Sequence, residues 1–123
     1  AGITALAAAP GLDAGARERA AQVLGATGAT VWLPDESLMD AVTAVSGSGP
    51  AYFYLLVELM EQAGRELGLP PALAATLARQ TALGAGRTLA ESGQDPAALR
   101  AAVTSPGGTT AAALAEFERA GLG

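Results

Sequence analysis

Hydrophobic and polar residues divide the chain into a short segment with strands and a longer helical segment. Residues 2–8 (GITALAA) predict a buried strand, and Asp13 predicts the N-cap of a helix that runs to about Leu24. On that helix, Val23 and Leu24 are expected to face inward. Residues 30–33 (TVWL) are β-branched and aromatic and predict a second strand. Two strands and one helix cannot bury both faces of a sheet, so we expect more sheet or a partner chain to complete this unit.

The pattern from residue 35 onward predicts helices and no further strand. One apolar stripe follows the first of these helices and consists of Leu38, Val42 and Val45. Residues 46–50 (SGSGP) predict a break, with Pro50 in the first turn of the next helix. This motif could form part of a pocket wall, but the sequence favours glycines that let two helices cross at short range.

The remaining pattern predicts a long apolar helix and three more helices. The helix after Pro50 is apolar on nearly every side until Glu61, which is typical of a helix that is buried all round. Asp95 and Pro96 predict the cap and the first position of a later helix. A helix between the one after Pro50 and the one at Pro96 has a narrow stripe suited to close packing, made of Leu73, Leu77, Thr81 and Gly84. The last helix follows residues 105–110 (SPGGTT), with Leu114 and Phe117 expected to face inward.

Composition narrows the classes of function. Half of the 123 residues are hydrophobic but only 4% are aromatic, so a core of small side chains needs closely packed helices and often a second chain. The net charge of −5 argues against a general nucleic-acid or anionic-membrane surface. Histidine, lysine and cysteine do not occur, which excludes histidine acid–base chemistry, thiolate nucleophiles and zinc–thiolate sites. We therefore expect no metal, no nucleic acid and no membrane as partners.

The SPGGTT motif is the strongest candidate for a binding site. The first turn of a helix offers unpaired N–H groups and a partial positive charge, and glycines let a ligand approach the backbone closely. The motif could therefore hold a small anion such as a carboxylate. From spacing alone, an ordinary loop with an N-cap is the more common interpretation.

Four segments, in order, resemble the pyrroline-5-carboxylate reductase family: DAVTAVSGSGPAYFYLLVELM, GLP, QTALGAG and LRAAVTSPGGTTAAALAEFE. SGSGPAY and VTSPGGTT together are specific, whereas either alone would be weaker. The resemblance implies a mainly α fold. Residues 35–123 would be an all-helical dimerisation and substrate-binding domain, similar to the C-terminal domain of 6-phosphogluconate dehydrogenase. Residues 1–34 would be the last β-α-β piece of a Rossmann-type NAD(P)-binding domain.

The resemblance also implies an activity. The family is an oxidoreductase that reduces 1-pyrroline-5-carboxylate to L-proline, the last step of proline biosynthesis, with NADPH or NADH. Carried over, Ser105 and the backbone amides of Thr109 and Thr110 hold the substrate carboxylate. The Thr110 hydroxyl is the catalytic group, which hydrogen-bonds the imine nitrogen and could relay a proton. The full substrate-binding set is Val103, Ser105, Gly107, Gly108, Thr109 and Thr110.

The family's Gly-rich dinucleotide loop lies upstream of the part that this chain matches. We therefore expect the cofactor to be bound mainly by a missing N-terminal domain, with no cofactor-binding residues here, and the isolated fragment to be inactive. The resemblance further implies a cytoplasmic homodimer of interleaved helices that could be built into a larger ring. The alternative is a catalytically inactive helical dimerisation module.

Overall fold

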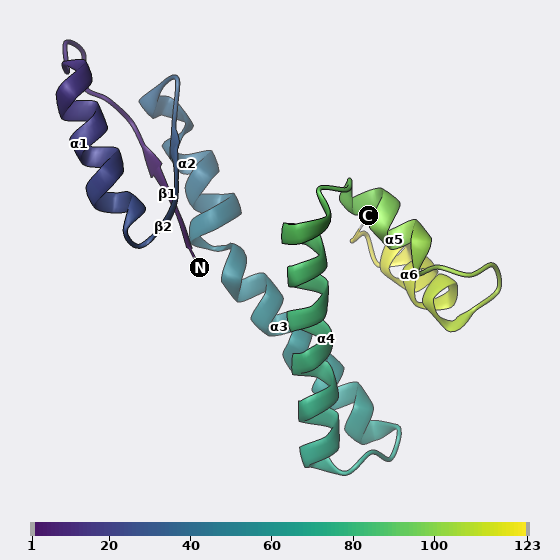
Figure 1. Cartoon of the computed structure of the whole chain (residues 1–123). Helices are drawn as coiled ribbons and strands as arrows, with labels where there is room; N and C mark the ends of the chain where they lie inside the picture. The colour runs from purple at the N-terminus through teal and green to yellow at the C-terminus, as the bar shows by residue number, and fades with distance from the viewer. Residues whose placement is uncertain (1, 123) are drawn as a thin grey trace. The chain divides into compact units, whose positions relative to one another are not determined.

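The computed structural model describes residues 2–122, which form two compact units, one running to Leu59 and the other beginning at Met60. The first unit contains β1 (Gly2–Leu6), α1 (Ala14–Gly25), β2 (Gly28–Trp32), the 3₁₀ helix η1 (Glu36–Leu38), α2 (Met39–Val42), the π-helical turn η2 (Thr43–Gly47) and the start of α3 (Gly49–Glu66). The second contains the end of α3, α4 (Pro71–Ser92), α5 (Pro96–Ala102) and α6 (Thr109–Arg119) (Figure 1). The predicted mainly helical fold after a β-α-β segment is confirmed.

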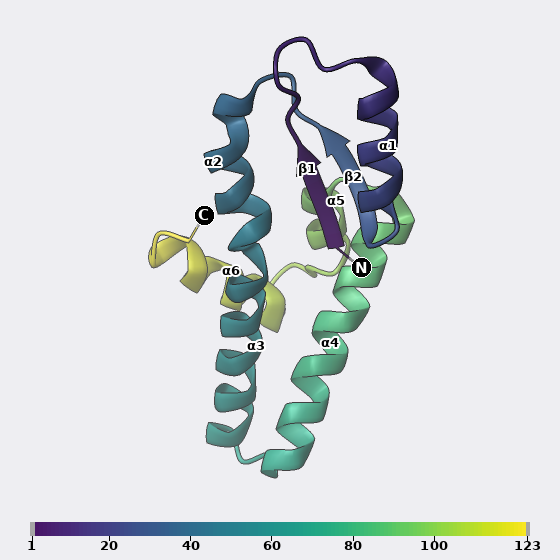
Figure 2. The ribbon, with the colours of Figure 1, turned by 90° about the vertical axis from the view of Figure 1, so that its left-hand side faces the viewer.

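The β-α-β segment is a parallel pair of strands joined by α1. β1 and β2 pair in register from Gly2 opposite Gly28 to Leu6 opposite Trp32, with α1 alongside the pair (Figure 2). Gly28 has a φ of 156°, and a Cβ there would lie 2.2 Å from the carbonyl oxygen of Gly2, so only glycine fits this start of β2. The predicted cap of α1 is also confirmed, because an Asp13 carboxylate oxygen accepts from the amide of Ala16 at 2.9 Å.

One expectation for α1 is wrong. Val23 is 70% exposed, whereas Ala16, Ala20 and Leu24 are half-buried. These three residues follow one another at intervals of four and therefore share a face, and Val23 lies about 100° away from Leu24 around the helix. The inward face of α1 thus lies on the side of Leu24 and these alanines, away from Val23.

The predicted break at residues 46–50 is a π-helical turn. The amide of Ser48 donates to the carbonyl of Thr43 at 2.8 Å, a bond that spans five residues, and α3 begins at Gly49. Proline lacks the amide for a normal helical bond, and its ring crowds the carbonyl four residues earlier. The wider turn ahead of Pro50 accommodates both effects without leaving helical conformation. The hydroxyl of Tyr52 also reaches back to the carbonyl of Ala44, at 3.3 Å.

Close packing between the end of α3 and the start of α4 depends on small residues. Ala74 and Ala78 are buried, and a Cβ on Gly64 would lie 3.1 Å from that of Ala74. An ion pair joins Arg79 to Glu61 at 2.9 Å beside this contact. The prediction that the stripe of α4 with Leu73 and Leu77 packs closely is wrong for the single chain, because these two side chains are 45% and 48% exposed. Alanine lets the two helices approach where leucine would hold them apart.

The apolar helix α3 is not buried by its own chain. Tyr52, Phe53 and Tyr54 are 60%, 63% and 72% exposed, and the leucines that follow are also largely open. Soluble monomers rarely leave such a continuous apolar surface uncovered. The surface of α3 is therefore suited to burial against a second chain. None of the helices in residues 2–122 is both long and apolar enough to cross a bilayer.

Candidate functional site

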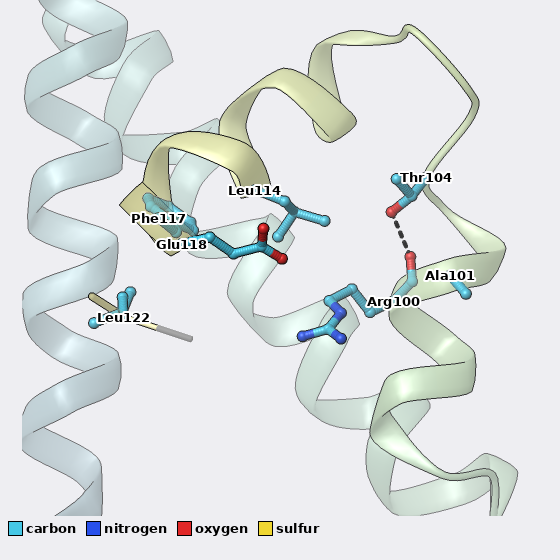
Figure 3. Close-up of a pocket in the computed structure, with 7 residues that line it drawn as sticks. All are labelled: Arg100, Ala101, Thr104, Leu114, Phe117, Glu118 and Leu122. Atoms are coloured by element: carbon cyan, nitrogen blue, oxygen red, sulfur yellow. Dashed lines mark hydrogen bonds between the residues drawn. The ribbon is translucent and has the colours of Figure 1, made fainter. Parts of the chain in front are cut away.

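The candidate site lies where α5 gives way to α6. An Asp95 carboxylate oxygen caps α5 by accepting from the amides of Ala97 and Ala98, at 2.8 and 3.4 Å, as predicted. At the other end of α5, the Thr104 hydroxyl donates to the carbonyl of Arg100 at 2.6 Å (Figure 3). The Thr104 amide also donates to Ala101, at 3.1 Å. The backbone is thus anchored immediately before Ser105.

Residues 105–108 form a tight turn. The amide of Gly108 donates to the carbonyl of Ser105 at 3.1 Å, Pro106 occupies the second position, and Gly107 has a φ of 68°. Proline followed by a residue with positive φ is the arrangement of a type II turn. The sequence S-P-G-G therefore fixes a reversal of the chain that starts α6 one residue later.

The turn presents the open amides of α6. Gly108 is the N-cap, with an extended conformation and no side-chain hydrogen bond, and the first backbone bond of the helix runs from Ala112 to Gly108 at 3.1 Å. The amides of Thr109, Thr110 and Ala111 precede that bond, so they have no partner within the helix. A side chain caps α1 and α5 but not α6. Like α4, α6 thus begins without a side-chain cap, and the amides of its first turn are left open.

The electrostatics of this helix end favour an anion. No acidic residue occupies the first turn of α6, so no side-chain carboxylate of that turn offsets the partial positive charge of the helix N-terminus. Three alanines follow the two threonines, which leaves the backbone of the first turns accessible. Thr110 is half-buried, whereas Thr109 and Ser105 are exposed. A small carboxylate could meet the amides and the Ser105 hydroxyl here.

The structure brings most of the predicted site residues into this one turn and helix start. Val103 also adjoins the turn, with 70% of its surface exposed. A separate cavity of about 300 Å³ lies between α5 and α6, with Arg100 and Glu118 among the residues that line it (Figure 3). Its other lining residues are Ala101, Thr104, Leu114, Phe117 and Leu122. The predicted site residues do not line this cavity.

Sequence reasoning missed Thr104. Its hydroxyl donates a hydrogen bond to the carbonyl four residues earlier, which is a common pattern for threonine at the end of a helix. A threonine at this position in the sequence could have indicated that bond. Among residues 2–122, no group of three or more acidic side chains is arranged to hold a metal ion. The site therefore consists of backbone amides and hydroxyl groups, which can bind and orient a ligand but supply no nucleophile or strong base.

The sequence of this chain is similar to that of a known family and its relatives. The pyrroline-5-carboxylate reductase dimerisation family matches residues 36–123. A pyrroline-5-carboxylate reductase of Pseudomonas aeruginosa is 53% identical over 105 residues, which cover 85% of this chain and 38% of that protein.

Solved structures agree in both sequence and fold. A pyrroline-5-carboxylate reductase of Coxiella burnetii has a TM-score of 0.90 and 38% identity, over 98% of this chain and 44% of that one. A pyrroline carboxylate reductase of Plasmodium falciparum with NADP bound has a TM-score of 0.82 and 29% identity, over 96% and 48%. The chain thus spans less than half the length of each relative. By sequence and by fold, it belongs to the pyrroline-5-carboxylate reductase dimerisation family.

Proposed function

We propose that the protein carrying this chain reduces 1-pyrroline-5-carboxylate to L-proline with a nicotinamide cofactor. The observation that carries the proposal is the start of α6, where the amides of the first turn are open and the Ser105 hydroxyl lies beside Gly108, within the family's VTSPGGTT motif. Family membership supports the reaction. The chain spans less than half of its relatives, so it would supply the substrate-binding and dimerisation part of the enzyme.

Binding of the substrate carboxylate is the first role of this site. The carboxylate would accept hydrogen bonds from the amides of Thr109 and Thr110 and from the hydroxyl of Ser105. Hydrogen bonds to a charged group are stronger than neutral ones, and the helix end adds a favourable field. Gly107 sets the conformation of the turn that exposes these amides, Gly108 precedes them as the N-cap of α6, and Val103 would form an apolar wall beside the ring.

Orientation of the imine is the second role. Holding the carboxylate at a fixed point orients the ring and thereby its C=N carbon. Such positioning can lower a barrier by about 7–11 kcal/mol. The cofactor would supply the hydride to carbon. The nitrogen must gain a proton, and the half-buried Thr110 hydroxyl is the group we assign to hydrogen-bond that nitrogen and relay to it a proton that solvent replaces on the hydroxyl. No nucleophile is needed, which fits a chain without histidine or cysteine.

The cofactor would be bound by residues outside this chain. The NADP in the Plasmodium falciparum relative supports a nicotinamide cofactor for the whole protein, and NADPH or NADH would both serve the chemistry. We propose a domain boundary near residue 35, with residues 1–34 completing the cofactor-binding domain upstream. Alone, the fragment would be inactive.

Dimerisation through α3 is the other part of the proposal. The family is a dimerisation family, and the open apolar surface of α3 needs a second chain to cover it. We propose an interleaved homodimer that could assemble further into a ring, in the cytoplasm. A dimerisation module without catalysis is the second candidate. It is supported by the fact that most of the described chain is helical and that the candidate site supplies no nucleophile or strong base.

The test is the oxidation of NADPH or NADH by the full-length gene product when 1-pyrroline-5-carboxylate is added. Wild-type protein is expected to be active, and Thr110→Val is expected to lower kcat/KM. An unchanged kcat/KM in that variant would refute the role assigned to Thr110. A folded dimer without any substrate-dependent oxidation would favour the module without catalysis.

A further inference from the structure

We propose that Gly108 is a positioning residue, whose missing side chain leaves the space in which the Ser105 hydroxyl lies against the start of α6. The inference rests on the proposed function, because it concerns how Ser105 comes to face the substrate carboxylate. It assigns to Gly108 a role different from that of its neighbour Gly107, although both belong to the same turn.

The geometry around Gly108 is close. A Cβ built on Gly108 would lie 2.5 Å from Oγ of Ser105 and 3.2 Å from its carbonyl oxygen. Carbon and oxygen atoms that are not bonded do not approach to 2.5 Å, so the hydroxyl occupies the volume that any other residue would fill. The hydroxyl thus sits at the N-cap residue itself, one residue before the open amides of Thr109 and Thr110.

Gly107 offers the contrast that defines this role. Its φ of 68° is in the left-handed region, and a Cβ there would meet no atom within 4 Å. Gly107 is therefore required for the backbone conformation of the turn. Gly108 has a φ of −80° and a ψ of 173°, which every residue adopts easily, so backbone conformation does not explain a glycine there. The space that the Ser105 hydroxyl needs explains the glycine at position 108.

A side chain at Gly108 would act through Ser105. The hydroxyl is the end of a flexible side chain, so an added methyl group can displace it by rotation about χ1, whereas the Ser105 carbonyl oxygen at 3.2 Å needs to yield by only a few tenths of an ångström. The displaced hydroxyl would no longer reach a carboxylate at the helix start. The amides would still bind that carboxylate, so substrate binding would weaken without being abolished.

The experiment is a double-mutant cycle in the full-length gene product. Its variants are Ser105→Ala, Gly108→Ala and the two together, with KM for 1-pyrroline-5-carboxylate, KM for the cofactor and kcat measured for each. A lost hydrogen bond to a charged group predicts that either single variant raises the substrate KM about tenfold. The cofactor KM is expected to stay constant. Gly25→Ala, which adds a methyl group to open space at the end of α1, is the matched control and should match wild type.

Non-additivity is the decisive result. If Gly108 acts through the hydroxyl, adding Gly108→Ala to Ser105→Ala should change the substrate KM little, because no hydroxyl remains to displace. An equal increase in both backgrounds, or no increase in either, would overturn the proposal. Should Gly108→Ala fail to fold, the double variant is expected to fold, and its failure would also overturn the proposal. Wild-type protein without activity would instead contradict the proposed function.

Discussion

Replacing Phe53 with alanine should weaken the proposed homodimer strongly. A fully exposed phenylalanine presents about 200 Å², and Phe53 leaves 63% of its surface open in the single chain. Covering that part removes roughly 125 Å² of apolar surface from water, which at ~25 cal/mol per Å² gives about 3 kcal/mol. Alanine retains part of this area, so the loss is about 2 kcal/mol for each chain.

A symmetric dimer contains the residue twice, so the substitution should cost about 4 kcal/mol and raise the dimer dissociation constant about a thousandfold. Sedimentation equilibrium of the gene product over a dilution series measures that constant. Gln62→Ala, on the same helix, is the matched control, because its exposed side chain only bonds Glu66 and carries little apolar area. An unchanged dissociation constant for Phe53→Ala would refute the view that a second chain covers α3.

Three further predictions concern the supports of the fold. Gly64→Val should lower the free energy of unfolding by about 1–3 kcal/mol, seen as a lower Tm, because a Cβ at position 64 would lie only 3.1 Å from the Cβ of Ala74. Asp95→Ala should cost about 1 kcal/mol in urea unfolding, since α5 loses its cap; an equal midpoint in both proteins would contradict this. Hydrogen bonds from Ser37 lower the pKa of the Asp35 carboxyl below its usual 3.8, so the stability that it adds is present above that pH and lost as pH falls through the lowered pKa. NMR titration should show this pKa, and stability compared with Asp35→Asn should show the loss only in acid.

Local rules predicted the elements of the fold well, and packing decided where they failed. The caps at Asp13 and Asp95 depend on neighbouring amides alone, so sequence was sufficient. The turn before Pro50 was harder, because a glycine-rich stretch before a proline fits both a loop and a π turn. The face of α4 that packs on its own chain holds Ala74 and Ala78, and the larger leucines drew the prediction to another face. Those leucines become core only if another chain covers them.

The candidate site was predictable as a motif but not as a geometry. SPGGTT indicates a turn followed by a helix with accessible amides, and the structure has both. Spacing alone could not separate an ordinary cap from an open helix end, because that depends on which side chain reaches the amides. The contact between Ser105 and Gly108 depends on a side-chain rotamer and a turn type together, which no sequence pattern specifies.

A crystal structure of the full-length gene product with bound L-proline tests the central claim most directly. The account predicts the proline carboxylate at the start of α6, within hydrogen-bond distance of the Ser105 hydroxyl and the amides of Thr109 and Thr110, with the ring nitrogen beside the Thr110 hydroxyl. Proline bound elsewhere, with the start of α6 in contact with solvent alone, would contradict it.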